Sequence, residues 1–226
     1  MRALLAGGAL VCVQAACSAD DSSEGGIGTT ATTTGSSGFG TTTSGAGGGG
    51  LPPEQELESS YRAPVATGRY VWITNPESGR VAFIDATTLS IELVDAGHAP
   101  TYLAGVPDPE DDVAIVLNVL SLDATLLRAG QGGELTTDSL AVPSGGNRWA
   151  ISADGRWATA WTDAREVENV DPLDGYQDIT VLDLHERVAT PLAVGYRPVE
   201  VGYDVASSRL FAVTQDGVSV IALDAP

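Results

Sequence analysis

Two short stretches decide the fold: Arg-Tyr-Val-Trp-Ile-Thr-Asn at residues 69–75 and Gly-Arg-Val-Ala-Phe-Ile-Asp at residues 79–85. Each is an apolar run of about five residues, and the residues between them, Pro76-Glu77-Ser78, favour a turn. Similar runs recur along the chain at residues 113–117, 179–183 and 210–214. No convincing amphipathic helix lies between them. Strands of this length at spacings of roughly ten residues predict an all-β antiparallel sandwich, barrel or propeller.

An internal repeat favours the propeller. Asp85 and Asp183 end similar strands 98 residues apart, and Gly97 and Gly195 have the same spacing. Half of that step, 49 residues, links Ala99, Arg148 and Arg197. A period of about 40 to 50 residues built from four short strands is typical of propeller blades.

The repeat predicts propeller-like blades of four antiparallel strands. We expect three strands at about 69–95, four at 101–142, four at 147–194 and three at 198–224. These fourteen strands make about three and a half blades, whereas closed propellers usually have about four to eight. The sequence therefore predicts an incomplete or open ring, which means either a truncated sequence or an arc completed by another chain.

The same residues resemble the YVTN-type β-propeller repeat proteins. Their unit runs from a Tyr-Val-x-Thr-Asn strand through a Val-Ile-Asp strand to a Gly-x-x-Pro corner, and residues 70–75, 79–85 and 97–100 are similar to it. Residues 180–183 and 195–198 are a looser match. The resemblance covers roughly residues 68–226 and implies a fold. It implies no particular function, because propellers serve as binding modules, scaffolds and enzymes.

The first residues predict export and lipid attachment. Residues 1–16 have the short positive start, apolar stretch and small-residue end of a signal peptide. Ala15-Ala16-Cys17 resembles the lipobox of bacterial lipoproteins, although Gln14 stands where that family prefers leucine. The resemblance implies a lipid on Cys17 and, through Ser18, an outer-membrane address in the cell envelope. The alternative is an ordinary signal peptide cut near the same place.

Composition separates a tether from the folded region. Residues 17–60 begin at Cys17 and are rich in glycine, serine and threonine, which predicts a disordered linker. Residues 61–226 form the predicted propeller region, whose incomplete ring means a truncated sequence or an arc completed by another chain. The formal net charge of the chain is −19 and it has no lysine, so nucleic acid is not an expected partner.

Two groups of polar residues are candidate sites. The predicted loop between the second and third strands of the third blade is long and acidic, and Asp171, Asp174 and Asp178 are candidate calcium ligands. The alternative is a solvated acidic loop that pairs with Arg148 and Arg197. No other cofactor is expected.

The corners between blades should bring His98, Arg148, Tyr196 and Arg197 towards one channel mouth, where a ligand would bind. The other histidine, His185, lies in a turn that propeller geometry places on the opposite face, so the two histidines should not share a zinc ion.

These features predict a lipid-anchored envelope protein that presents a propeller scaffold to a protein or small-molecule ligand, with no catalytic residues. The alternative is a propeller enzyme of the lactonase or quinone-dependent dehydrogenase type, with its site at the channel mouth. Such an enzyme would need acidic, histidine or arginine side chains that converge from several blades.

Overall fold

The computed structural model describes residues 60–223. The chain divides into two parts, Met1–Glu54 and Gln55–Pro226, and all described residues belong to the second. The predicted signal peptide, Cys17 and nearly all of the tether lie outside the described residues. Within residues 60–223, no helix is long and apolar enough to cross a membrane.

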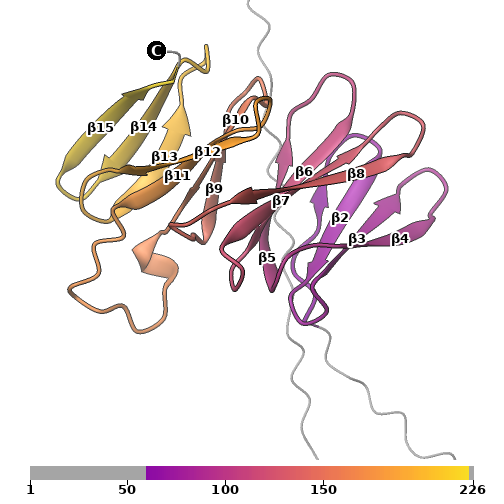
Figure 1. Ribbon diagram of the computed structural model, residues 1–226, viewed down its shortest axis with the longest axis horizontal. Coiled ribbons are helices and arrows are strands. Elements are labelled where there is room, and N and C mark those ends of the chain that lie inside the picture. Colours follow the sequence, from indigo (N-terminus) through magenta and orange to yellow (C-terminus); the bar gives the residue numbers. More distant parts are fainter. Residues whose placement is uncertain (1–59, 224–226) are drawn as a thin grey trace, which may run out of the picture. The chain divides into compact units, whose positions relative to one another are not determined.

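The described residues form four antiparallel sheets of four, four, four and three strands, each ordered as in the sequence (Figure 1). The first contains β1 (Val65–Ala66), β2 (Tyr70–Asn75), β3 (Arg80–Asp85) and β4 (Ile91–Asp95). The second contains β5 (Pro100–Val106), β6 (Asp112–Asn118), β7 (Asp123–Ala129) and β8 (Leu135–Ala141). The third contains β9 (Arg148–Ile151), β10 (Trp157–Trp161), β11 (Asp178–Asp183) and β12 (Val188–Ala193). The last contains β13 (Pro198–Tyr203), β14 (Arg209–Thr214) and β15 (Gly217–Ala222).

This architecture confirms the predicted all-β, propeller-like fold. Among residues 60–223 the first and last sheets share no strand pairing, so these residues form no closed ring. The strand count differs by one from the prediction, because β1 pairs with β2 and completes the first sheet. A strand of two residues carries no alternating apolar pattern, which is why the sequence did not reveal it.

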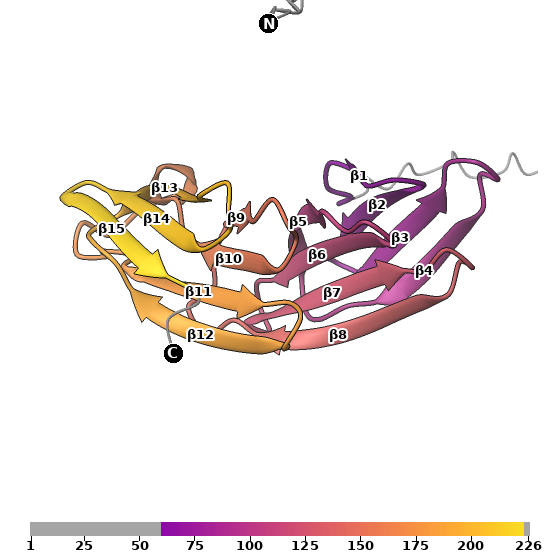
Figure 2. The ribbon, with the colours of Figure 1, turned by 90° about the horizontal axis from the view of Figure 1, so that it is seen from above.

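Three apolar clusters hold successive sheets together. Tyr70, Trp72 and Phe83 of the first sheet pack against Val116 and Leu127 of the second. Equivalent clusters join the second sheet to the third and the third to the fourth. The middle strands β6 and β10 are buried almost throughout, whereas β4 and β12 are largely exposed. Figure 2 shows the innermost strands β5, β9 and β13 on one side and β4, β8 and β12 on the other.

The strand register corrects one alignment in the predicted repeat. Pro100, Arg148 and Pro198 are the first residues of β5, β9 and β13, and each pairs with the last residue of the next strand. Arg148 is therefore equivalent to the two prolines, and Ala99 and Arg197 are equivalent to Asn147 instead. Ala99 and Arg197 share a left-handed backbone, with φ of 55° and 47°. The even spacing of 49 residues concealed this shift because the loops of successive sheets differ in length.

The predicted equivalence of Gly97 and Gly195 is confirmed. After Gly97, the amide of His98 donates to Ser121 Oγ at 2.9 Å. After Gly195, the amide of Tyr196 donates to Asp216 Oδ1 at 2.9 Å. A side chain on either glycine would collide with the next hairpin, so both corners need glycine for a close approach.

Candidate ligand-binding hollow on the innermost strands

The structure distributes the four predicted ligand residues over separate places. His98 lines a hollow with the turn residues 76–79 and Leu120. Arg148 lines a different hollow, between the innermost strands of the first three sheets. Tyr196 and Arg197 line neither of these two hollows and contact the acidic loop instead.

Arg197 is bound to the acidic loop, which occupies residues 162–177 between β10 and β11. Its Nε donates to the carbonyl oxygen of Asp174 and its Nη2 to that of Asp171, both at 3.0 Å. The Tyr196 hydroxyl donates to the Pro172 carbonyl at 3.1 Å. These bonds hold backbone carbonyls, so Arg197 fixes the path of the loop rather than neutralising its carboxylates.

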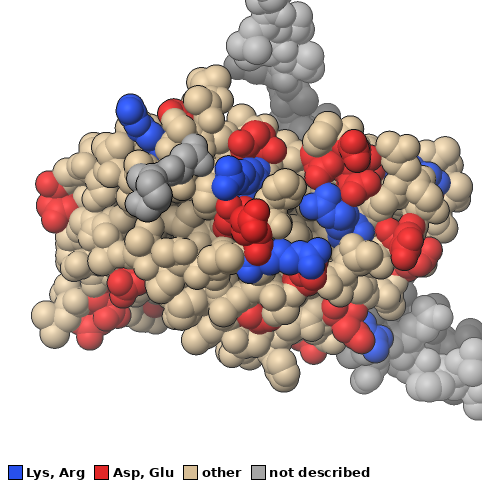
Figure 3. Space-filling view, turned by 45° about the horizontal axis from the view of Figure 1, so that its top comes forward, with Lys and Arg blue, Asp and Glu red and all other residues tan. Residues whose placement is uncertain are grey.

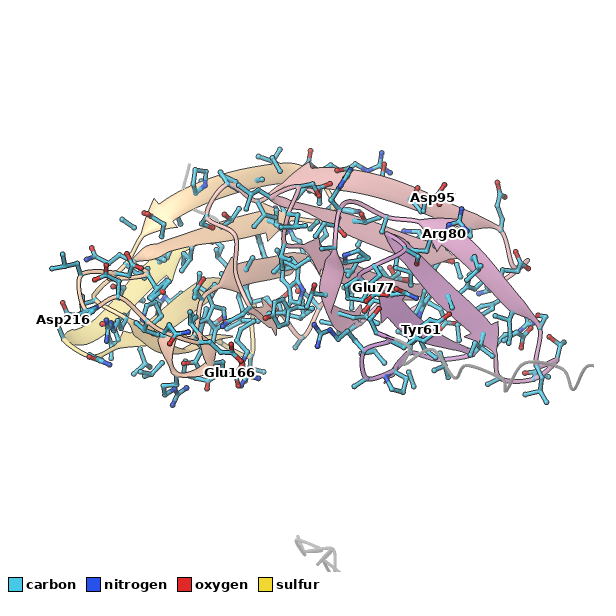
Figure 4. All side chains as sticks on the ribbon, turned by 90° about the horizontal axis from the view of Figure 1, so that it is seen from below. Tyr61, Glu77, Arg80, Asp95, Glu166 and Asp216 are labelled. Carbon is cyan, nitrogen blue, oxygen red and sulfur yellow. The ribbon has the colours of Figure 1, made fainter. Side chains whose placement is uncertain are left out.

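The first turn of the same loop is attached by ion pairs. Arg148 pairs with Glu166, which Figure 4 labels on this loop. The predicted pairing with an acidic side chain of the loop is therefore confirmed for Arg148, whereas Arg197 contacts the loop through its backbone. Asn147 and Asp163 exchange two hydrogen bonds, from Asn147 Nδ2 to the Asp163 carbonyl and from the Asp163 amide to Asn147 Oδ1. The loop is thus fastened to the start of β9.

Arg165, in a 3₁₀ turn (Ala164–Glu166), connects this loop to the last sheet. Its guanidinium donates to the Asp163 carboxylate and, at 2.7 Å, to the carbonyl of Val199 in β13. The Arg165 guanidinium holds the pKa of the Asp163 carboxyl below its ordinary value, although burial acts in the opposite direction. Asp163 is therefore ionised at neutral pH and serves as a structural anchor.

Calcium binding by Asp171, Asp174 and Asp178 stays a prediction. Asp171 Oδ1 accepts a hydrogen bond from the Leu173 amide at 2.8 Å, which shapes the turn. Asp178 is the first residue of β11. Across residues 60–223 no three acidic, histidine or cysteine side chains are grouped so that they could hold a metal ion. The structure therefore adds nothing to the sequence argument for calcium.

The hollow beside Arg148 has the chemistry of a ligand site. It has a volume of about 460 Å³ and is bordered by β5, β9 and the segment that leads into β1. Its polar and aromatic lining consists of Arg62, Thr101, Tyr102, Asn147, Arg148 and Trp149. Trp149 Nε1 donates to the Tyr102 carbonyl at 2.9 Å, which fixes the indole across two sheets. The site therefore offers positive charge beside partly buried aromatic surface.

Arg62 supplies the available positive charge in this hollow. It is exposed, and no acceptor among residues 60–223 contacts its guanidinium, whereas Arg148 is already paired with Glu166. In a chain with a net charge of −19, most described arginines are paired with carboxylates in this way. An arginine without such a partner, beside an aromatic ring, is suited to an organic anion.

A second hollow of about 460 Å³ lies between β1 and the corner after β5, and it has the opposite charge. Three of its four lining carboxylates, all but that of Glu110, have partners within the protein. Asp112 accepts from the amides of Gly68 and Arg69, and Asp108 and Asp111 accept from Arg128. Figure 3 shows arginines flanked by acidic side chains on the face that it presents. This second hollow is therefore a less suitable ligand site.

Sequence reasoning found Arg148 but missed Arg62, Tyr102 and Trp149. It considered the corners between blades, where repeated positions stand out, and not the interiors of the innermost strands. The Arg148-Trp149 pair at the start of an innermost strand was the available signal. Arg62 carried none, because it precedes a strand of only two residues.

Comparisons with known proteins identify the fold only. No family model matches the chain, and no curated protein matches it. Hydrazine synthase of Kuenenia stuttgartiensis is 19% identical, with a TM-score of 0.50 over 76% of this chain and 49% of that one. Hsv2 of Kluyveromyces lactis is 9% identical, with a TM-score of 0.52 over 75% of this chain and 50% of that one. A candidate 6-phosphogluconolactonase of Bacteroides uniformis is 16% identical, with a TM-score of 0.47 over 73% and 50%.

The chain thus spans about half the length of these solved structures. At identities this low the likeness concerns the fold alone. Together with the four sheets it defines the class: this is a protein with a β-propeller-like fold.

Proposed function

We propose that this protein is a lipid-anchored binding scaffold of the cell envelope that holds an organic anion in the hollow beside Arg62 and Arg148. The observation that carries the binding proposal is the guanidinium of Arg62, which no acceptor within residues 60–223 contacts, in a hollow walled by Tyr102 and Trp149. The anchoring part rests on the sequence alone, since Cys17 lies outside the described residues.

The chemistry of the lining selects the class of ligand. Arginine binds carboxylate or phosphate through two parallel hydrogen bonds, and its charge makes each bond stronger than one between neutral groups. Tyr102 and Trp149 are half-buried and offer ring surface for stacking. The preferred ligand therefore carries a carboxylate or phosphate next to a planar or apolar group.

The binding proposal is tested by titrating the isotope-labelled protein with phenyl phosphate and following the indole N–H signals. The chain has four tryptophans, and only Trp149 lines this hollow. We expect the indole signal that is missing from Trp149→Phe to shift with saturation, while the other three stay in place. No shift, or equal shifts of all four signals, would argue against the site.

The anchoring proposal is tested by growing expressing cells with a clickable fatty acid. Cys17 should carry the label, so the wild-type chain should be marked and Cys17→Ser should not. Cys12→Ser serves as the matched control and should retain the label, because residue 12 lies within the predicted signal peptide. Equal labelling of the wild type and Cys17→Ser would overturn lipid attachment.

The alternative, a propeller enzyme of the lactonase or quinone-dependent dehydrogenase type, is the weaker proposal. In the acidic hollow between β1 and the corner after β5, Asp108, Asp111 and Asp112 are engaged by arginine or by backbone amides. Burial raises the pKa of the Tyr203 hydroxyl, so that group stays protonated and is a poor base. No observation on the described residues favours catalysis over binding.

A further inference from the structure

Within residues 60–223, two apolar sheet faces are not covered by another sheet. On the outer side of the first sheet, the strand register aligns Val71 with Ile84 and Ile91, and Ile73 with Ala82 and Leu93. We call these six residues the leading face. Ile91 and Leu93 are 65% and 59% exposed, Ala82 is buried and the other three are half-buried, so the face is open mainly along β4.

The last sheet has a matching uncovered side. Phe211 aligns with Val220 and Val213 with Val218, and we call these four residues the trailing face. Val218 and Val220 are 59% and 58% exposed. The opposite side of the same strands, with Leu210 and Ala212, is buried against the third sheet.

The trailing face repeats a surface that is buried elsewhere in the chain. Counted along the paired strands, Phe211-Val220 corresponds to Trp72-Phe83 in the first sheet. In the same way, Val213-Val218 corresponds to Thr74-Val81. Trp72, Val81 and Phe83 are nearly inaccessible, because the second sheet covers them. The trailing face therefore corresponds to the side of a sheet that accepts its successor.

The leading face repeats the other half of the same contact. Val71-Ile84 and Ile73-Ala82 occupy the positions of Ala114-Leu127 and Val116-Thr125 in the second sheet. Ala114, Val116 and Leu127 are buried against the first sheet. The two open faces thus have the chemistry of the two sides of one interface, which the chain already makes three times within itself.

Charge does not oppose this contact, although the chain has a net charge of −19. At the edge of the leading face Arg80 pairs with Asp95 at 3.0 Å, and Figure 4 shows these two residues on the first sheet. On the trailing side, Glu200 pairs with Val213 and lies on the same side of the sheet. Arg209 precedes Phe211 by two residues on β14 and lies on that side as well. Each face therefore carries one positive and one negative side chain, so two copies would meet without strong repulsion.

We propose that a second copy of this chain covers these surfaces, with the trailing face of each copy packed on the leading face of its partner. Two such contacts related by a twofold axis would join two arrays of four sheets into one ring. Eight sheets is within the usual range of about four to eight blades for a closed propeller. This inference is independent of the ligand-binding proposal.

The first test measures the oligomeric state of the full chain carrying Cys12→Ser and Cys17→Ser, by sedimentation velocity from low to high micromolar concentration. We expect a dimer. Val220→Asp and Leu93→Asp should each weaken the dimer at least tenfold, because each places a charge in an apolar contact. Val205→Asp is the matched control, since Val205 is 98% exposed and lies on neither face. A monomer at every concentration, or equal weakening by Val205→Asp, would overturn the proposal.

The second test determines which faces meet. Leu93→Cys and Val220→Cys are prepared separately in the same cysteine-free background, and a short bismaleimide is added to each variant and to their mixture. Head-to-tail contact predicts a covalent dimer in the mixture and little in either variant alone. Dimers in a single-variant sample would mean that like faces meet, and an absence of dimers in the mixture would contradict the contact. Both positions are more than half exposed, so neither substitution should prevent folding.

Discussion

The guanidinium of Arg156 donates to the carboxylate of Asp183 on the neighbouring strand, with an Nη2–Oδ2 distance of 3.0 Å. Two sheets earlier, Arg69 contacts Asp85 in the same way. In both pairs the arginine precedes the second strand of its sheet and lies over the ring of the next residue, Trp157 or Tyr70. The other oxygen of each aspartate accepts two amides of the following turn. The repeated unit of the fold therefore includes, besides its apolar strands, an arginine–aspartate ion pair whose aspartate also binds the following turn.

Asp183→Ala should lower the free energy of unfolding by about 1 to 3 kcal/mol, because the amides of His185 and Glu186 lose their acceptor and the ion pair with Arg156 is removed. The arginine itself is partly exposed, so Arg156→Ala should cost less, about 1 kcal/mol or below. Urea unfolding measures both values. Asp178→Ala, an exposed position at the start of the same strand, is the control and should change stability by no more than about 0.5 kcal/mol. If Asp178→Ala lowered the free energy of unfolding as much as Asp183→Ala, the ion pair and turn contacts of Asp183 would make no specific contribution.

Stability should fall in acid. The Arg69 guanidinium lowers the pKa of Asp85, and amide and arginine hydrogen bonds lower that of Asp183 despite its burial. A carboxyl whose pKa is lower in the folded state stabilises fully above the unfolded value of about 3.9, and this contribution is lost as the pH falls through the folded value. Acidification also relieves repulsion in a chain of net charge −19, so the loss should begin only below about pH 4. Chemical unfolding across this range should show it.

The Asp85→Asn, Asp183→Asn double variant separates these two effects of acid. It keeps the side-chain shape but cannot ionise at either position, so its stability should change less than that of the wild type below about pH 4. Parallel curves for the two proteins would contradict the assignment to these carboxyls.

Arg197→Ala should loosen the acidic loop without unfolding the sheets. Its guanidinium holds the carbonyls of Asp171 and Asp174, and its loss should raise amide exchange and proteolytic cleavage between residues 167 and 176 about tenfold, the equivalent of about 1.4 kcal/mol. Hydrogen exchange with mass spectrometry resolves the segment. Arg187→Ala, which removes an exposed ion pair with Asp138, should leave exchange there unchanged. Unaltered exchange in Arg197→Ala would show that the loop is held by other contacts.

The sequence predicted the fold well because the strands carry their own signals. Residues 70–75 and 80–85 show apolar runs bounded by turn residues, and both became strands. Gly97 and Gly195 marked equivalent corners because both are needed for close approach. The sequence could not reveal β1, whose two residues pair with β2 only because the rest of the first sheet is in place.

The candidate site was less predictable for a physical reason. Arg148 and Arg197 appeared equivalent by spacing, yet one begins β9 and the other precedes β13. A shift of one residue relative to the strand register turns a corner side chain in another direction. Because the loops of successive sheets differ in length, the spacing in the sequence does not reveal this shift. Arg62, Tyr102 and Trp149 come from three segments that only the packing of three sheets brings to one hollow.

The most direct test of the account is a calorimetric titration of phenyl phosphate into the wild type, Arg62→Ala and Arg187→Ala. Arg62 lines the hollow, whereas Arg187 lies in a turn outside it, so the two variants lose the same charge in different places. The account predicts that Arg62→Ala binds at least tenfold more weakly, a difference of about 1.4 kcal/mol, and that Arg187→Ala binds like the wild type. Equal affinities for all three proteins, or an equal loss in both variants, would contradict the claim that this hollow is the binding site.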